Sequence, residues 1–384
     1  MRFRIIRQSY KSTLKRILYP RKIMGLFQMA VASNKGLKFF LVICLVMVCM
    51  FLWQYAWVDN SVFIRGGHFT EHRDVFREHI VQDVEIDRRS IVLAARELLK
   101  GRETEEQPQR HVICPSFSGG LGNMLFQYAS AYGISRRVGL DILVKADAEV
   151  FQVFDIWAKV SSEKSVCPKA KIIKERHSGI YEHSLMSVRN NADYVAKGYL
   201  QSWKYFEPFR DEIRKQLRFR GDIERKAFDI LESTLSEKYG RGNYSSRTLV
   251  GVHVRRGNLM NKHEREYGYK VATPGYMKKA LAFFTHKYRH VTFIVCSNDM
   301  KWSRHYVNET DVIYVEGNPR EVDLALLSSL NHTILTVGTF GWWSAWMANG
   351  TTLFFKDFVK DGTKFAREFS PEHSDYLYPG WIGM

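Results

Sequence analysis

The chain has 384 residues, 45% of them hydrophobic and 14% aromatic, so it can bury a sizeable core and is not an intrinsically disordered protein. Its formal net charge is +17, but residues 1–38 contain ten basic side chains and no acidic one. The remaining 47 basic and 40 acidic residues nearly balance. Because the excess charge belongs to the N-terminus, composition gives little support for nucleic-acid binding.

An apolar segment, residues 39–58, follows the basic stretch and contains no charged residue. Its length matches a helix that crosses a bilayer, and the basic side is expected to face the cytosol. The segment is long for a signal peptide and has no small-residue cleavage site, which favours an uncleaved anchor over a cleaved signal. We predict a cytoplasmic basic tail (1–38), a transmembrane signal-anchor (39–58) and a polar stem (59–110) with an amphipathic helix over 87–100.

Cysteines and glycosylation motifs fit a lumenal location for the rest of the chain. Cys114, Cys167 and Cys296 lie beyond the predicted span, so at most one disulfide forms among them, and which pair it joins is open. Four Asn-x-Ser/Thr glycosylation motifs begin at Asn243, Asn308, Asn331 and Asn349. Two of these asparagines, Asn331 and Asn349, border apolar runs, where burial would prevent their glycosylation.

Residues 112–145 predict a strand, a glycine loop, a helix and a second strand. The strands cover 112–115 and 140–145, and the helix covers about 123–138. Glycines before a helix let backbone N–H groups approach an anion, although such turns also occur without a ligand. The spacing matches neither the dinucleotide motif nor the Walker motif. Residues 146–245 are less regular, with helices expected over 206–217 and 222–239.

Residues 248–355 alternate between strands and helices. We expect strands at 249–254, 291–296, 311–315, 333–337 and 351–355, and helices at about 275–288, 321–330 and 339–348, with a short helix after 299. This alternation predicts a doubly wound parallel sheet. The fold class is therefore α/β, with two Rossmann-like half-domains covering 111–245 and 246–384.

Polar residues stand at three strand ends of this second half. Arg255 and Arg256 follow the strand 249–254, Asp299 follows the next, and Thr339 opens a later helix. Such ends meet at one crevice, where guanidinium groups suit a phosphate and a carboxylate suits a base. Together they predict a nucleotide-diphosphate site. A neighbouring aromatic run is expected in the helix core, with contact to a sugar as the alternative: Phe340, Trp342, Trp343 and Trp346.

The chain contains no Asp-x-Asp, the carboxylate pair that holds a divalent metal on a donor pyrophosphate. Arginine would then supply the counter-charge, and we expect no metal and no cofactor. The anchor, the lumenal location and the nucleotide crevice together suggest a glycosyltransferase.

Four segments in order resemble the alpha-1,2-fucosyltransferases that use GDP-fucose: 118–139, 250–258, 296–302 and 323–350. The resemblance covers roughly residues 111–360 and implies a GT-B-like, metal-independent enzyme. It implies transfer of L-fucose, with inversion, to the 2-hydroxyl of a terminal galactose on glycoprotein or glycolipid glycans. It also implies a single-pass type II Golgi membrane protein with its catalytic part in the lumen, whose partners are GDP-fucose and a beta-galactoside-terminated acceptor.

The resemblance assigns the catalytic role to Arg255, which would hold the beta-phosphate and stabilise the departing GDP. His253 and Asp299 would contact the guanosine, and Thr339 with nearby N–H groups would bind phosphate oxygens. The remaining expected contacts to the donor are Arg256, Phe340, Gly120, Gly122 and Asn123.

Two residues depart from the family pattern. Asn258 replaces an aspartate and Met124 replaces a glutamine, which leaves the general base unassigned. Candidates for the base or for an acceptor contact are Asn258, His263, Glu264 and Glu266. These departures keep an alternative open, a non-catalytic, membrane-anchored relative that binds a glycan or nucleotide. Acceptor choice is expected to lie in residues 146–245.

Overall fold

Residues 110–163 and 166–384 are described by the structure, a computed structural model, and they belong to the second of two units of the chain, Gln107–Met384. The predicted tail, the predicted span and the stem up to residue 109, including its amphipathic helix, lie outside the described residues. Within the described ranges, no helix combines the length and apolar character needed to cross a bilayer.

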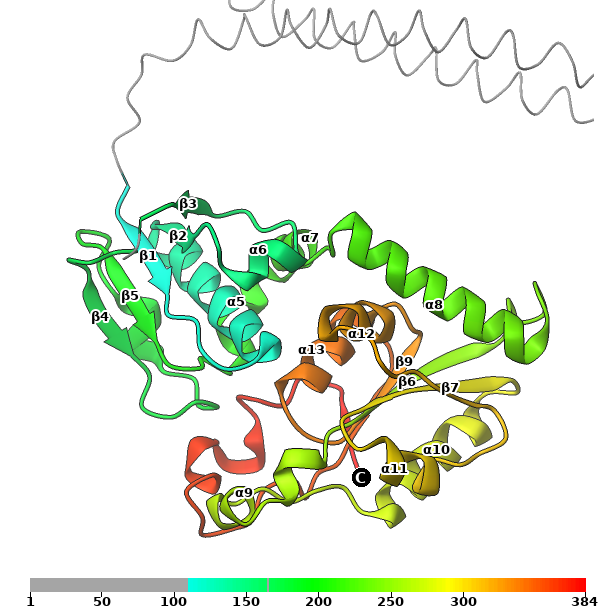
Figure 1. The fold of residues 1–384 in the computed structure, drawn as a ribbon. Helices are drawn as coiled ribbons and strands as arrows, with labels where there is room; N and C mark the ends of the chain where they lie inside the picture. The colour runs from blue at the N-terminus through cyan, green and yellow to red at the C-terminus, as the bar shows by residue number, and fades with distance from the viewer. Residues whose placement is uncertain (1–109, 164–165) are drawn as a thin grey trace, which may run out of the picture. The chain divides into compact units, whose positions relative to one another are not determined.

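The first sheet has five parallel strands in the order β3-β2-β1-β5-β4 (Figure 1). In its central strand β1 (Val112–Pro115), buried Ile113 aligns with Ile142 of β2 and Tyr194 of β5. The other elements of this part are β2 (Asp141–Lys145), β3 (Lys159–Ser161), β4 (Lys171–Lys174), β5 (Tyr194–Lys197), α5 (Leu121–Val138), α6 (Glu149–Val153), α7 (Arg210–Gln216), α8 (Gly221–Tyr239), η1 (His183–Ser187), η2 (Trp203–Tyr205) and η3 (Glu207–Phe209).

Strands β3, β4 and β5 come from the region in which the sequence showed no regular pattern. β3 and β4 are the edge strands, and most of their side chains are exposed, so they lack the continuous apolar run of a buried parallel strand. The helix expected over 206–217 is also shorter, because Phe209 leaves helical geometry (φ −118°, ψ 23°) and separates η3 from α7.

The second sheet has six parallel strands in the order β11-β10-β9-β6-β7-β8. Its inner strands β9, β6 and β7 are labelled in Figure 1. The predicted α/β alternation is confirmed, and β6 lies inside the sheet with Val250, Val252 and Val254 fully buried. The elements are β6 (Thr248–Val254), β7 (Val291–Ser297), β8 (Val312–Tyr314), β9 (His332–Leu335), β10 (Thr352–Phe354), β11 (Ile382–Gly383), α9 (Lys262–Tyr267), α10 (Pro274–Lys287), α11 (Met300–Tyr306), α12 (Arg320–Ser328), α13 (Thr339–Ala348), η4 (Gly257–Met260), η5 (Ala366–Glu368) and η6 (Pro371–His373).

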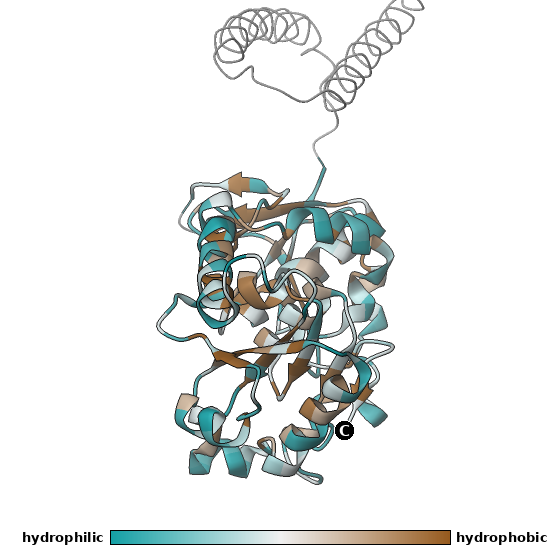
Figure 2. Cartoon of the chain, turned by 90° about the vertical axis from the view of Figure 1, so that its right-hand side faces the viewer, coloured by the Kyte–Doolittle hydropathy of each residue, from teal (hydrophilic) through white to brown (hydrophobic). Residues whose placement is uncertain are grey.

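Helix α13 packs between the second sheet and helix α5. Trp342, Trp343 and Trp346 are buried, which confirms that the tryptophans of the aromatic run belong to the core, whereas Phe340 is half-buried. The Phe126 ring of α5 lies 4.5 Å from the Trp342 ring, centroid to centroid. A helix that is apolar on all sides, like α13, is expected to be buried. Figure 2 shows the apolar colour on the strands and inner helices, while the outer helices are more hydrophilic.

The segment after β10 returns to the first part of the fold. Glu368 Oε2 accepts hydrogen bonds from the Ser178 N–H and hydroxyl, at 2.7 and 2.9 Å. The Lys204 ammonium donates to Asp375 Oδ1 at 2.5 Å. No motif in the sequence indicated this return. The C-terminal residues therefore contribute to both halves of the fold.

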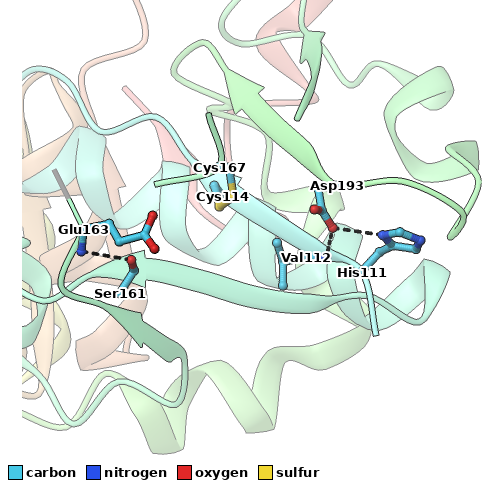
Figure 3. Close-up of a disulfide and its surroundings, with 7 residues drawn as sticks. All are labelled: His111, Val112, Cys114, Ser161, Glu163, Cys167 and Asp193. Atoms are coloured by element: carbon cyan, nitrogen blue, oxygen red, sulfur yellow. Dashed lines mark hydrogen bonds and ion pairs between the residues drawn. A yellow bond between two sulfur atoms is a disulfide. The ribbon is translucent and has the colours of Figure 1, made fainter. Parts of the chain in front are cut away.

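One disulfide joins Cys114 of β1 to Cys167 in the loop before β4 (Figure 3). Cys296 of β7 is buried and free. The structure thus answers the question of pairing that the sequence left open. The bond ties the central strand of the first sheet to a loop far from it in sequence.

The four glycosylation motifs all begin at exposed asparagines. The expectation that Asn331 and Asn349 are buried is wrong, because one precedes β9 and the other ends α13 at the surface. Both side chains are nevertheless engaged. Asn331 Oδ1 accepts from the Leu249 N–H at 2.8 Å, and Asn349 Oδ1 accepts from Arg210 at 2.7 Å and Arg214 at 3.2 Å.

Candidate functional site

Two adjacent arginines, Arg255 and Arg256, follow strand β6 and have different surroundings. Successive side chains of an extended chain point to opposite faces. Arg256 is bound within the chain: its Nε lies 3.5 Å from Asp299 Oδ2, and its guanidinium lies 4.8 Å from the Trp302 ring centroid. Its N–H donates to Asn298 Oδ1 at 2.8 Å. Arg256 therefore stabilises the start of α11.

Arg255 extends instead toward the start of α13. Its N–H donates to Thr336 Oγ1 at 2.9 Å, and a Cβ added to Gly338 would lie 2.7 Å from its Nη1. Across residues 110–163 and 166–384, no carboxylate forms an ion pair with its guanidinium. No side chain caps α13, so a permanent cation lies beside the unpaired N–H groups of a helix start. Both features favour a bound anion.

The glycine loop before α5 meets the same helix start. The Thr339 hydroxyl donates to Asn123 Oδ1 at 2.8 Å. Gly122 is buried, and a Cβ there would lie 2.6 Å from the Phe340 nitrogen, so only glycine fits. Gly120 is exposed, with no atom within 4 Å of an added Cβ. The structure therefore brings together three groups that the sequence singled out separately: the glycine loop, Thr339 and Arg255.

His253 lies on the Arg255 side of β6 and is buried against Phe340, with ring centroids 5.0 Å apart. Burial lowers the pKa of His253 to about 3, and the charge of Arg255 adds to this effect. The imidazole is therefore neutral near pH 7. The positive groups of the site are therefore the Arg255 guanidinium and the N-terminal end of α13.

Asp299 has partners within the chain for both carboxylate oxygens. Oδ1 accepts from the Trp302 N–H at 3.1 Å and so caps α11, while Oδ2 faces Arg256. A nucleobase bound at this strand end would have to share the Asp299 carboxylate with Trp302 and Arg256.

The candidates for a general base lie in different environments. His263 and Glu266 have side chains that are 88% and 67% exposed, whereas the Glu264 side chain is 28% exposed. Glu264 also helps to raise the pKa of Tyr269, chiefly elevated by burial. Of these three residues of α9, Glu264 is the least exposed, and its backbone carbonyl accepts from the Tyr269 N–H at 3.1 Å. Asn258 is exposed, and its Oδ1 accepts from Asn298 Nδ2 at 3.5 Å.

Met124, the other departure from the family pattern, is partly buried and packs against the hydrophobic core. In this chain the position contributes to packing. The resemblance implies a glutamine here, so this chain lacks a polar side chain at the position.

Two tyrosines whose pKa values respond to the charge of Arg255 were not found from the sequence. Burial raises the pKa of Tyr269 to about 12, and the charge of Arg255 opposes this rise. Tyr376, from the C-terminal segment, also feels the Arg255 charge. Neither tyrosine belongs to a motif, and each lies far from Arg255 in sequence or beyond a loop. Only the folded chain brings them within reach of its charge.

Gln201, after β5, is a third residue that the sequence did not indicate. Its Nε2 donates to Asn123 Oδ1 at 3.1 Å, the same atom that accepts from Thr339. The one signal for it in the sequence was the group of glycine and aromatic residues at 198–203. This group follows β5, a strand that the sequence did not predict.

In the part of the chain that the structure describes, no group of three or more His, Cys, Asp and Glu side chains is placed to hold a metal ion. A metal-independent reaction stays a prediction. The positive charge at this site comes from the Arg255 side chain.

Comparisons with known proteins assign the chain to a family. Residues 89–384 match the family described as glycosyl transferase family 11. Galactoside alpha-(1,2)-fucosyltransferase 2 of Sus scrofa is 30% identical over 279 residues, which cover 69% of this chain and 78% of the relative. The protein of the same name from Rattus norvegicus is 31% identical over 277 residues, covering 69% and 75%.

Among solved structures, the fucosyltransferase NodZ from Bradyrhizobium aligns with a TM-score of 0.42 at 14% identity, over 62% of this chain and 93% of its own. That similarity is too low to add to the assignment. The family match and the relatives confirm the family that the motifs resembled. The chain belongs to glycosyl transferase family 11, the family of the galactoside alpha-(1,2)-fucosyltransferases.

Proposed function

We propose that this protein transfers L-fucose from GDP-fucose, with inversion, to the 2-hydroxyl of a terminal galactose on glycoprotein or glycolipid glycans. Its family and the names of its relatives support this reaction. The observation that carries the proposal is the Arg255 guanidinium beside the uncapped start of α13. A GT-B-like arrangement would bind the donor at this end of the second sheet.

The site is suited to stabilise a departing diphosphate. As the bond between fucose C1 and the phosphate oxygen breaks, negative charge grows on GDP. Arg255 and the first N–H groups of α13 face the region where that charge develops, and they are fixed before the reaction begins. Thr339, held by Asn123, can contact a phosphate oxygen. No metal is required for this charge stabilisation.

The acceptor must lose a proton as its oxygen attacks. The galactose 2-hydroxyl forms a bond to fucose C1, GDP leaves, and the hydroxyl proton passes to a base. We propose Glu264 for this base, because it is less exposed than His263 and Glu266 and lies near Tyr269. The remaining expected donor contacts, including His253, Asp299 and the glycine loop, are part of the same proposal.

A non-catalytic relative that binds a glycan or nucleotide is the second candidate function. The observation that favours it is Asn258, an exposed amide where the family has a carboxylate. GDP binding without turnover on a wide panel of galactosides would support this candidate.

We also propose a type II Golgi membrane protein with an anchor at 39–58 and a lumenal catalytic part. The disulfide and the exposed motifs at Asn243 and Asn308 support an oxidising, glycosylating compartment. Protease protection of the C-terminal part inside vesicles tests this topology, and digestion without detergent contradicts it.

The reaction is tested with purified full-length protein in detergent. We expect calorimetry to detect GDP binding and a beta-galactoside panel to yield fucosylated product without added metal. A protein that binds no GDP and transfers nothing would refute the proposal.

A further inference from the structure

A buried carboxylate, Glu175, lies just after β4 and has no basic ion-pair partner among the described residues. It instead binds backbone. Oε1 accepts from the Tyr199 N–H at 2.5 Å, and both oxygens lie 2.9 Å from the Leu200 nitrogen. Burying a carboxyl group is costly unless hydrogen bonds satisfy its oxygens, so these contacts have a structural task. The task is to hold the turn at residues 198–201.

That turn has an unfavourable backbone. Gly198 has φ +120° and Leu200 has φ +51°, a value that side chains other than glycine rarely adopt. A Cβ on Gly198 would lie 2.4 Å from Glu175 Oε1. Two further buried side chains fix the turn: Gln127 Nε2 donates to the Gly198 carbonyl at 2.9 Å, and the Ser130 hydroxyl donates to the Leu200 carbonyl at 2.8 Å. Strained backbone held this firmly is typical of functional sites.

The turn faces the donor site from the first half of the fold. Gln201 binds Asn123, which binds Thr339 at the start of α13. The Tyr199 side chain is 39% exposed. Burial raises the pKa of Tyr267 and of Tyr269, and Tyr199 adds to both rises. Through Gln201 and Asn123 the turn is therefore linked to the start of α13, against which Arg255 lies.

We propose that the turn at 198–201 is the acceptor-binding side of the donor site and that Glu175 is the positioning residue that holds it. Tyr199 offers an exposed ring to the apolar face of a pyranose, and the Gln201 amide stands where a sugar hydroxyl can bind. The donor diphosphate belongs at Arg255 and α13, so the second sugar must enter from this opposite side. This inference rests on the proposed fucosyl transfer.

Full-length Tyr199→Ala and Glu175→Gln are compared with wild type for GDP affinity by calorimetry and for acceptor KM and kcat with a beta-galactoside. We expect Tyr199→Ala to raise acceptor KM roughly tenfold, with kcat and GDP affinity within about twofold of wild type. Glu175→Gln retains one acceptor oxygen and should raise KM by a smaller factor. Phe228→Ala, on α8 and 61% exposed, is the matched control and should leave all three values unchanged.

An acceptor KM within about twofold of wild type in both variants would overturn the inference. Equal losses of GDP affinity and acceptor affinity would also overturn it, because they would show a structural or donor role. If instead wild type itself neither binds GDP nor transfers fucose, the proposed reaction is wrong, and the inference falls with it.

Discussion

The Thr339 hydroxyl donates to Asn123 Oδ1 at 2.8 Å across 216 positions of the chain. This bond joins the start of α13 to the start of α5, and therefore the second half of the fold to the first. Because Arg255 lies against the residue just before Thr339, the bond also fixes one wall of the proposed phosphate site.

Replacing Arg255 should remove most of the leaving-group stabilisation. We expect Arg255→Ala to lower kcat by roughly 10²–10³-fold or more, the range found when one charge-stabilising donor is lost. Arg255→Lys should rescue little, because the ammonium cannot reproduce the guanidinium fork. Steady-state kinetics with GDP-fucose measure both effects. Near-normal rates in either variant would contradict the role given to Arg255.

Gly122 and Gly120 form a matched pair two positions apart. Gly122→Ala places a Cβ 2.6 Å from the Phe340 nitrogen, so α5 and α13 must separate. We expect a loss of about 1–3 kcal/mol in the free energy of unfolding, with lower activity. Gly120→Ala meets no atom within 4 Å and should change stability by less than about 0.5 kcal/mol. Equal behaviour of the two variants in chemical denaturation would refute the close backbone contact.

Glu264 and Glu266 test the general base. Glu264→Gln should lower kcat by roughly 10²–10⁴-fold while GDP affinity stays unchanged, because a base acts on the acceptor proton only. Glu266→Gln should have little effect, since that side chain is largely exposed and pairs with Lys262 at 3.7 Å. Equal rates for the two variants would remove Glu264 from the mechanism.

Glu175 predicts a pH dependence of stability. Burial raises the pKa of Glu175 to about 8, opposed by the hydrogen bonds from the Leu200 and Tyr199 N–H groups, whereas the unfolded chain has the ordinary value near 4.5. Between these values the folded state holds a proton that the unfolded state releases, so stability falls as pH rises from about 4.5 to 8. Urea titrations should show this slope for wild type relative to Glu175→Gln. A pH-independent difference between the two proteins would contradict the raised pKa.

The parts of the fold that could be predicted are those whose signal is local. The buried run of β6 and the arginines after it stand together in sequence, and so do the turn and tryptophans of α13. The edge strands β3 and β4 escaped because their side chains face solvent and give no apolar run. They lie in the region where acceptor choice was expected.

The candidate site was predicted in the same partial way. Arg255, Thr339 and the glycine loop carry recognisable patterns, and the fold does place them together. Gln201, Tyr269 and Tyr376 reach the site through tertiary packing, from segments with no motif of their own. The return of the C-terminal segment has the same character, because it depends on ion pairs such as Lys204 with Asp375. Contacts of this kind between distant polar residues leave no periodic trace in a sequence.

The central claim is tested most directly by analysing the product of wild-type protein incubated with GDP-fucose and a terminal beta-galactoside, with no metal added. Nuclear magnetic resonance should show an alpha-linked fucose on the galactose 2-oxygen, formed in equal amount to free GDP, and Arg255→Ala should form roughly a hundredth of the product or less in the same time. A fucose in beta linkage, a linkage to another hydroxyl, or equal product from Arg255→Ala would contradict the account.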